Sequence, residues 1–289
     1  MKNTSKHVKS IKVVKFGGSS VADAKQILKV IDIVTSDRDR RIVVVSAPGK
    51  RFANDTKVTD LLIALAEAVI AGSAYDRELS LVVDRYAEIQ KSLVLEEGII
   101  GDIESDLQHR IKGRSQNDAQ FMDTLKAAGE DSNAKLIAQA FVKQGISARY
   151  VDPKTAGMRL SDDFGNARVL PESFSSLAAL RDEKEIIIFP GFFGYTKQNQ
   201  VATFPRGGSD ITGAILAAAV KADVYENFTD VDSVFAMDPR IVPDAPPIQL
   251  LTFREMRELA YAGFGVFHDE AVIPDSGASG TSERSPSSA

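Results

Sequence analysis

The sequence predicts an α/β fold, a three-layer α-β-α sandwich in which a mostly parallel central sheet lies between helices. Short runs of β-branched and apolar residues recur along the chain, and such runs are typical of strands buried on both faces. Segments with apolar residues at helical spacing separate these runs, so strands and helices alternate. Glycine or proline follows several strands, which indicates that loops begin where those strands end.

Composition excludes several classes of protein. The chain has 289 residues, 44% of them hydrophobic, which is enough for one large domain or two modest ones. It has no cysteine, which excludes disulfides, a thiol nucleophile and thiolate metal sites and fits a reducing cytoplasm. A net charge of −5 does not produce the positive field that attracts nucleic acid, and no apolar run is nearly long enough to span a membrane. We therefore expect a cytoplasmic protein without a nucleic-acid or membrane partner.

The first predicted strand, residues 11–16, carries Lys15 and leads through a Gly-Gly-Ser turn at 17–19 into a helix over 21–36. A strand, a glycine turn and a helix N-terminus together offer backbone N–H groups and a positive dipole end to an anion. Glycine also lets a phosphate approach the backbone closely. The stretch matches neither G-x-G-x-x-G nor G-x-x-x-x-G-K-[ST], so an ordinary turn with a solvated lysine fits it as well.

A second buried strand is predicted over residues 41–46, and the proline-glycine turn after it places Ser46 in a loop. The next helix begins between 56 and 59 and ends at Gly72, a favourable C-terminal cap. The helical pattern then continues over 75–126. We interpret this part as a helical excursion between elements of the sheet.

Another helix is predicted over residues 128–145, with Ser132 as its N-cap. Glu130 and Asp131 then lie just before or within the first turn, where negative charge suits the helix dipole. That position accounts well for Asp131. Glu130 follows a glycine and can instead project into a cleft.

The remaining segments complete the alternation of strands and helices. A helix through Lys221 is predicted to begin at the RGGSD segment, with Ser209 or Asp210 as its cap. The other predicted elements are strands over 146–152, 185–189 and 223–228, a hairpin strand over 164–170, a long loop over 191–210 and an acidic loop over 229–240.

The candidate functional segments all follow strands. In parallel sheets, ligands bind beyond the carboxyl ends of the strands. The Lys15 turn, Ser46, the 191–210 loop and the 229–230 pair all lie at such ends. Two glycine-rich helix N-termini with lysine, arginine and acidic residues suit a polyphosphate and a second anionic or zwitterionic substrate. Phosphoryl transfer needs mainly positioning and charge cancellation, and no Ser-His-Asp set is evident.

Several motifs in order resemble those of the aspartate kinase (aspartokinase) family, which has the amino acid kinase fold. They are VVKFGGSSV, VVVSAPGK with KVTDLL, GED, FPGFFG, RGGSDITGAILAAAVKAD and FTDVDSVFAMDPR, and the resemblance runs from about residue 11 to 274. It implies phosphorylation of the β-carboxylate of L-aspartate by ATP, the first step towards lysine, threonine and methionine. It also implies Mg²⁺ held mainly by the nucleotide phosphates, no protein metal site, and a homodimer formed through the kinase domain.

The resemblance also implies roles for residues at the amino-acid end of the site. Glu130 matches the carboxylate that receives the substrate's α-ammonium group. Arg206 matches the arginine that binds a substrate carboxylate, for which its planar fork suits better than lysine, and Ser209 would assist it. Ser46, and Thr59 with Asp60, match positions that line the aspartate and phosphate region. Thr59 can also simply cap a helix.

At the nucleotide end, the resemblance implies that Lys15 bridges the transferring phosphoryl group and that Asp210 orients Lys15 and the phosphates. Phe235 stands where many relatives have tyrosine and can instead belong to the core, and Arg240 can merely pair with Asp238. The residues that would bind the nucleotide are Gly17, Gly18, Ser19, Thr229, Asp230, Phe235, Asp238 and Arg240.

The expected domain organisation is a flexible leader (1–10), a catalytic domain (11–274) and a disordered low-complexity tail (275–289). The catalytic domain would divide into an amino-acid-binding part, about 11–195, and a nucleotide-binding part, about 196–274.

Two features depart from the family pattern. Gly265 stands where many relatives have a lysine that reaches the nucleotide, and regulatory ACT domains are absent, so we expect no feedback inhibition through this chain. The alternatives are a nucleotide-binding remnant with little activity, or a sibling kinase acting on another amino acid or on carbamate.

Overall fold

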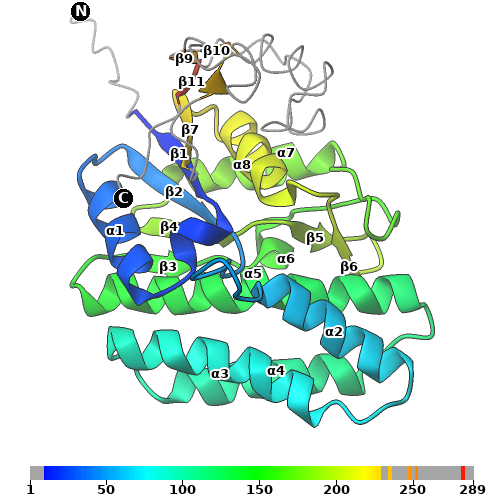
Figure 1. The fold of residues 1–289 in the computed structure, drawn as a ribbon. Coiled ribbons are helices and arrows are strands. Elements are labelled where there is room, and N and C mark those ends of the chain that lie inside the picture. Colours follow the sequence, from blue (N-terminus) through cyan, green and yellow to red (C-terminus); the bar gives the residue numbers. More distant parts are fainter. Residues whose placement is uncertain (1–9, 229–233, 236–246, 249–250, 253–280, 284–289) are drawn as a thin grey trace, which may run out of the picture.

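The computed structural model describes residues 10–228, 234–235, 247–248, 251–252 and 281–283, and its central sheet is mostly parallel (Figure 1). The strand order is β10-β11-β7-β1-β2-β4-β3, and every pair is parallel except β10 with β11. The strands of this sheet are β1 (Lys12–Phe16), β2 (Arg40–Val45), β3 (Ala148–Tyr150), β4 (Ile186–Pro190), β7 (Val224–Phe228), β10 (Leu251–Thr252) and β11 (Thr281–Glu283).

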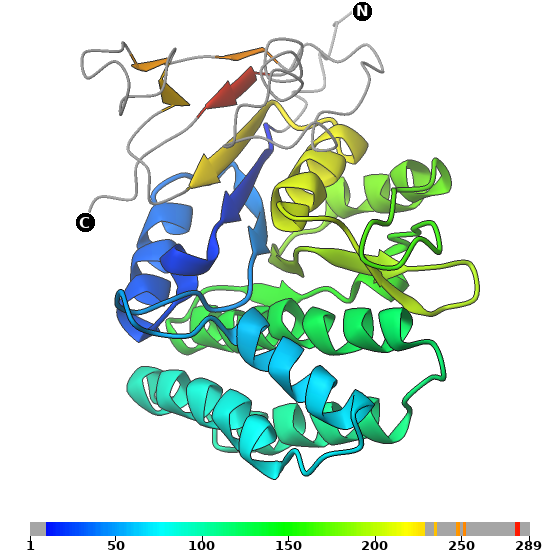
Figure 2. The same cartoon turned by 45° about the vertical axis from the view of Figure 1, so that its right-hand side comes forward.

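Helices cover both faces of the sheet, which confirms the predicted three-layer sandwich (Figures 1 and 2). On one face, α1 (Ala24–Thr35) and α5 (Asp118–Lys143) pack against strands, and α2 (Val58–Ile70), α3 (Asp76–Leu93) and α4 (Gly98–Lys112) pack around α5. On the other face, α8 (Gly208–Ala219) packs on β1, β2 and β7, with α7 (Glu172–Leu177) beside it. The short elements η1 (Gly18–Val21), α6 (Pro153–Ala156) and η2 (Ala178–Asp182) complete the described helices.

The side chains on the two faces of each central strand belong to two separate hydrophobic cores. In β1, Val14 and Phe16 belong to the core under α1 and α5, whereas Val13 belongs to the core under α8. Side chains alternate between the faces of a strand, so a strand covered on both sides must be apolar at consecutive positions. This is why the predicted strands read as continuous apolar runs. No helix in the described part of the chain is long and apolar enough to cross a membrane.

The predicted start of the 128–145 helix is wrong. Helix α5 begins at Asp118, and its N-cap is Asn117, whose side-chain oxygen accepts a hydrogen bond from the Gln120 N–H at 3.1 Å. Ser132 is a buried residue in the middle of this helix. The helix is buried on nearly all sides between sheet and outer helices, so polar residues in its interior resembled a helix start.

Two further predictions on the second half of the chain are also corrected. The predicted 191–210 loop contains a hairpin formed by β5 (Phe193–Tyr195) and β6 (Val201–Thr203), and Gly207, with a φ of 86°, is the N-cap of α8. The left-handed conformation of Gly207 turns the chain into the helix two residues before a Ser209 cap, and three before an Asp210 cap, would do so. The predicted 164–170 strand is reduced to one isolated bridge between Leu160 and Val169.

The remaining described strands lie near the C-terminus. Strand β8 (Val234–Phe235) pairs with β9 (Pro247–Ile248). Strand β11 falls within the segment predicted to be a disordered tail, and it pairs in parallel with β7. Such pairing uses backbone groups, so it needs none of the apolar residues whose lack led to that prediction. The division of 11–274 into two functional parts stays a prediction.

Candidate functional site

A cavity of about 900 Å³ lies beyond the carboxyl ends of β1 and β2, beside the N-terminal ends of α2 and α8. The structure brings together in its wall all the predicted site residues that precede residue 229. These are Lys15, Gly17, Gly18, Ser19, Ser46, Thr59, Asp60, Glu130, Arg206, Ser209 and Asp210.

The other positions singled out in the sequence follow residue 228. Thr229, Asp230, Asp238, Arg240 and Gly265 lie outside the described residues. The sixth position, residue 235, lies in β8, where only the backbone course is described.

Lys15 is held in the cavity wall by an ion pair between β1 and α8. Its Nζ lies 2.8 Å from Asp210 Oδ1, and the Asn227 side-chain amide donates to the same oxygen at 2.7 Å. Lys15 and Asn227 are register partners on the paired strands β1 and β7. Three elements thus fix one cation at the strand ends, and its low exposure strengthens its interaction with any anion in the cavity.

Two glycine turns meet at one end of the cavity. The Gly49 N–H donates to the Gly18 carbonyl at 2.8 Å, so the turn after β2 packs directly on the turn after β1. A Cβ on Gly49 would lie 2.6 Å from the Gly18 carbonyl carbon, a distance that requires the backbone to move. Glycine at position 49 therefore allows the close approach of the two turns.

We expect Gly49→Ala to disrupt this contact and to raise the KM for a phosphorylated substrate at least tenfold, because the added methyl group displaces the Gly18 backbone. Steady-state kinetics would measure the change. Gly101→Ala is the control: a Cβ at this position in α4 meets nothing within 4 Å, so the kinetic constants should stay unchanged. A wild-type KM for Gly49→Ala would contradict the role of the contact.

Glu130 is a buried carboxyl group in the wall of the cavity. It is 5% exposed, and burial raises its pKa to about 8, although the Ala47 backbone N–H and nearby Lys126 act in the opposite direction. Its Oε2 has no hydrogen-bond partner within the described part of the chain. Because a buried unpaired oxygen is costly, a cationic ligand that donates to it would bind favourably.

Arg206 and Ser209 lie at the turn that opens α8. Arg206 is exposed and makes no ion pair among the described residues, so its guanidinium is available to a carboxylate or phosphate. Ser209 is buried against Gly191, where a Cβ would lie 2.5 Å from the Ser209 hydroxyl oxygen. The loop after β4 therefore fixes the position of the Ser209 side chain.

Three lysines that also line the cavity are not among the predicted site residues: Lys50, Lys57 and Lys126. The Lys126 ammonium lies 3.0 Å from Asp123 Oδ1 and donates to the Thr203 hydroxyl at 3.3 Å. It precedes Glu130 by four residues, and positions i and i+4 of a helix share a face. That spacing would have revealed Lys126 had the helix been predicted to begin at residue 118.

The charges of the cavity suit two ligands that carry phosphate and carboxylate groups. The cationic side chains are Lys15, Lys50, Lys57, Lys126 and Arg206, and the acidic ones are Asp60, Glu130 and Asp210. In the part of the chain that the structure describes, no cluster of three or more histidine, aspartate or glutamate side chains could hold a metal ion. The arrangement therefore matches phosphoryl transfer, in which a protein supplies mainly position and positive charge.

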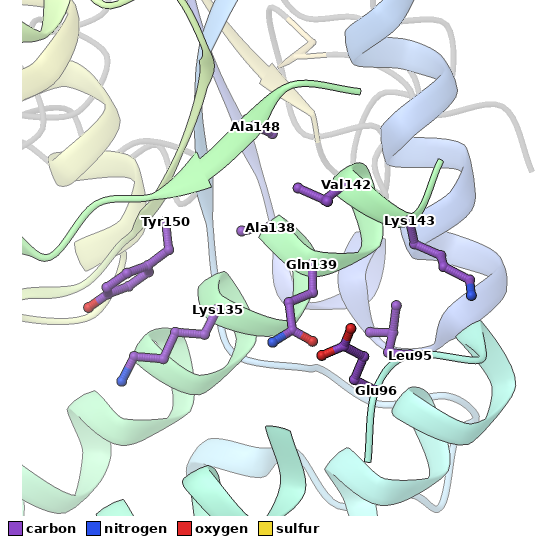
Figure 3. A pocket seen from close by; sticks show the side chains of 9 residues that line it. All are labelled: Leu95, Glu96, Lys135, Ala138, Gln139, Val142, Lys143, Ala148 and Tyr150. Carbon is purple, nitrogen blue, oxygen red and sulfur yellow. The ribbon is translucent and has the colours of Figure 1, made fainter. Parts of the chain in front are cut away.

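A second hollow, of about 590 Å³, lies between the C-terminal half of α5, β3 and the connection after α3 (Figure 3). Its wall includes Lys135, Gln139 and Tyr150. The Lys135 ammonium lies 2.9 Å from Asp131 Oδ2, and the Tyr150 hydroxyl donates to the other oxygen of Asp131. Lys135 and Tyr150 are thus both paired with Asp131, whereas Glu130 Oε2 has no partner among the described residues.

Comparisons with known proteins agree with this geometry. The chain is 55% identical to aspartokinase 3 of Bacillus subtilis over 91% of its own length and 58% of that protein. A crystal structure of Escherichia coli aspartokinase III in complex with aspartate and ADP superposes with a TM-score of 0.82 at 29% identity, covering 96% of this chain and 62% of that one.

A crystal structure of Clostridium acetobutylicum aspartate kinase gives a TM-score of 0.78 at 31% identity, covering 95% of this chain and 63% of that one. The chain thus spans about three-fifths of the length of these relatives. A sequence model of the amino acid kinase family matches residues 10–277, nearly the whole chain. With this match, the fold and the cavity at the strand ends, the chain belongs to the amino acid kinase family.

Proposed function

We propose that the protein transfers the γ-phosphoryl group of ATP to the β-carboxylate of L-aspartate, giving 4-phospho-L-aspartate and ADP. The observation that carries this proposal is the buried, unpaired Glu130 oxygen in the same cavity as the Lys15–Asp210 pair and Arg206. The E. coli relative, whose structure contains aspartate and ADP, supports the choice of substrates. The reaction would be the first step towards lysine, threonine and methionine.

At the amino-acid end, Glu130 would accept the α-ammonium group of aspartate at its unpaired oxygen. Arg206 would bind a substrate carboxylate through its fork, and Ser209, held against Gly191, would donate to the same ligand. Ser46 and Thr59, with Asp60, would line the path between aspartate and the phosphates. The carboxyl group of Glu130, once it has lost its proton, and the guanidinium of Arg206 fit the ammonium and carboxylate groups of an amino acid.

At the nucleotide end, a β-carboxylate oxygen attacks the γ-phosphorus while the bond to the β–γ bridging oxygen breaks, and ADP leaves with the electron pair. The attacking carboxylate is already ionised, so no proton needs to be removed from it. Lys15 would neutralise charge on the migrating phosphoryl group, and Asp210 would orient Lys15. The backbone at Gly17 and Gly18, with Ser19, would contact the phosphates.

Other parts of the proposal rest on the resemblance alone. Mg²⁺ would enter as part of the Mg-ATP substrate, held mainly by the phosphates. Thr229 with Asp230 and Phe235, and the pair Asp238 and Arg240, would bind the nucleotide. A homodimer formed through this domain and a cytoplasmic location also belong to the proposal.

Trapping the acyl phosphate tests the proposed function. The purified chain is incubated with Mg-ATP, hydroxylamine and either L-aspartate or L-glutamate, and the hydroxamate is measured. Hydroxamate with aspartate but not with glutamate supports the proposal. Product with glutamate would favour a sibling kinase, and ATP binding without any turnover would favour a nucleotide-binding remnant.

We expect Arg206→Lys to raise the KM for the amino acid about 10- to 100-fold, because a point charge replaces a fork that can make two parallel hydrogen bonds. The KM for ATP should change much less. Arg168→Lys, on the segment between α6 and α7 and outside the cavity wall, is the matched control. Equal changes in both KM values would show that Arg206 does not act at the amino-acid end.

A further inference from the structure

Arg85 is a buried cation that the proposed reaction does not use. It lies in α3, is 4% exposed and is not part of the cavity wall. Arginine is rarely buried this deeply unless its charge and its donors are paired. Its partners therefore indicate what the side chain does in this position.

The Arg85 guanidinium joins the two turns that meet at one end of the cavity. Its Nη2 donates to the carbonyl of Ala22 at 3.0 Å and to that of Gly49 at 2.6 Å. Ala22 is the C-cap of the short helix that follows the Gly17-Gly18 turn, and Gly49 contacts Gly18 directly. One nitrogen thus links the backbones of both turns from behind the cavity wall.

The same guanidinium also fixes the loop between β2 and α2. Its Nη1 donates to Asp55 Oδ2 at 2.7 Å, and Asp55 accepts from Arg51 Nε at 2.8 Å and Nη2 at 2.9 Å. This loop brings Lys50 and Lys57 to the cavity. Arg85 is therefore bonded to the segment after β1 at Ala22 and to the loop after β2 at Gly49 and Asp55.

We propose that Arg85 is a positioning residue that holds the two glycine turns at the separation which the nucleotide phosphates require. The proposal rests on the proposed function, because it takes this end of the cavity to be the phosphate end. The Gly49 N–H joins the two turns directly, and Arg85 adds a side-chain donor from a third element that binds the backbone of both segments. A displacement of about 1 Å at a reacting group can cost about 10²-fold in rate.

Replacing Arg85 with methionine tests the proposal. Asp55 keeps both hydrogen bonds from the Arg51 side chain, so the substitution leaves no unpaired buried carboxylate. We expect the Kd for ADP, measured by titration calorimetry, to rise at least tenfold, together with the KM for ATP. The KM for the amino acid should change less than twofold. Arg85→Lys, which keeps the charge but loses the fork, should shift the same constants in the same direction.

Arg181→Met is the matched control. Arg181 Nη1 also donates to two backbone carbonyls, those of Val220 at 2.6 Å and Lys221 at 2.7 Å, but at the end of α8 that is remote from the cavity. Its loss should lower the Tm and leave the Kd for ADP unchanged.

Three results would overturn the proposal: wild-type ADP affinity in both Arg85 variants, an equal loss of affinity in Arg181→Met, or parallel increases in both KM values. If Arg85→Met does not fold, Arg85→Lys decides the question. A wild-type chain that binds no ADP would refute the proposed function itself. Normal ADP binding and hydroxamate formation in the Arg85 variants would refute only the role of Arg85.

Discussion

Replacing Lys15 with methionine is expected to lower kcat by about 10³-fold, the loss typical of a group that stabilises developing charge in a transition state. The Lys15 ammonium lies 2.8 Å from Asp210 Oδ1 in a largely buried wall of the cavity. In such surroundings a positive charge acts on phosphoryl oxygens with little screening by water. Methionine has a similar length and removes only the charge and the donors.

The fold should survive this substitution. Asp210 keeps the hydrogen bond from the Asn227 amide at 2.7 Å, so its carboxylate is not left without a partner. Circular dichroism and thermal unfolding would verify this. Lys25→Met, at an exposed lysine on α1, is the control and should retain wild-type kinetics. An unchanged kcat in folded Lys15→Met would remove Lys15 from the mechanism.

Replacing Glu130 with glutamine is expected to raise the KM for the amino acid 10- to 100-fold. Glutamine keeps the shape of the side chain but cannot ionise when the ammonium group of the amino acid binds, and a hydrogen bond to a charged group contributes about 1.5–3 kcal/mol. The KM for ATP should change little, since the proposed partner of Glu130 is the ammonium group of the amino acid. Steady-state kinetics with each substrate varied in turn would measure the difference.

The same variant should be more stable than the wild type at alkaline pH. Burial raises the pKa of Glu130 from 4.5 to about 8, so between these values the folded state holds a proton that the unfolded state releases. The contribution of Glu130 to stability is therefore fully present below pH 4.5 and is lost as pH rises to about 8. We expect the advantage of Glu130→Gln to grow by a few kcal/mol between pH 5 and pH 8.

Denaturant unfolding at the two pH values would measure this advantage. Glu67→Gln, at an exposed glutamate on α2, should show no such trend. A stability difference between wild type and Glu130→Gln that stays constant with pH would contradict the raised pKa. A variant that gains stability and loses amino-acid affinity would show that the buried carboxyl group contributes to substrate binding and lowers the free energy of unfolding.

The sequence predicted the central sheet well because its strands have a simple physical signature. Strands β2 and β4 contain runs of consecutive apolar residues, as burial on both faces requires, whereas β1 includes Lys15 and β7 includes the buried Glu226 and Asn227. Their order along the chain, with helices between, then implies parallel pairing and a site at their carboxyl ends. The convergence of Lys15, Ser46 and the RGGSD turn on one cavity follows from this topology.

Helix α5 shows what local sequence could not predict. Because it is buried between the sheet and α2 to α4, acidic residues such as Asp123 and Asp131 have tertiary partners, and no amphipathic stripe marks its start. The first turns, with Lys126, were therefore assigned to the preceding helical segment, and the helix was predicted to begin only at residue 128. Glu130 was identified by resemblance to a family, and its buried, unpaired state became visible only in the structure.

Arg85 shows the same limit more strongly. Its sequence position, within a helix rich in charged residues, is that of an ordinary surface arginine. Its partners at Ala22, Gly49 and Asp55 come from other elements, so only the folded chain brings them together. A role that depends on contacts between distant parts of the chain cannot be predicted from the local sequence pattern.

The most direct test of the account follows an oxygen atom from substrate to product. Aspartate labelled with ¹⁸O in its β-carboxylate is incubated with the chain, Mg-ATP and hydroxylamine, and the inorganic phosphate is analysed by mass spectrometry. If a β-carboxylate oxygen attacks the γ-phosphorus in this cavity, hydroxylamine will displace that oxygen with the phosphate, which will carry one ¹⁸O. Phosphate without the label would mean that water attacked ATP instead, and the proposed transfer would be wrong.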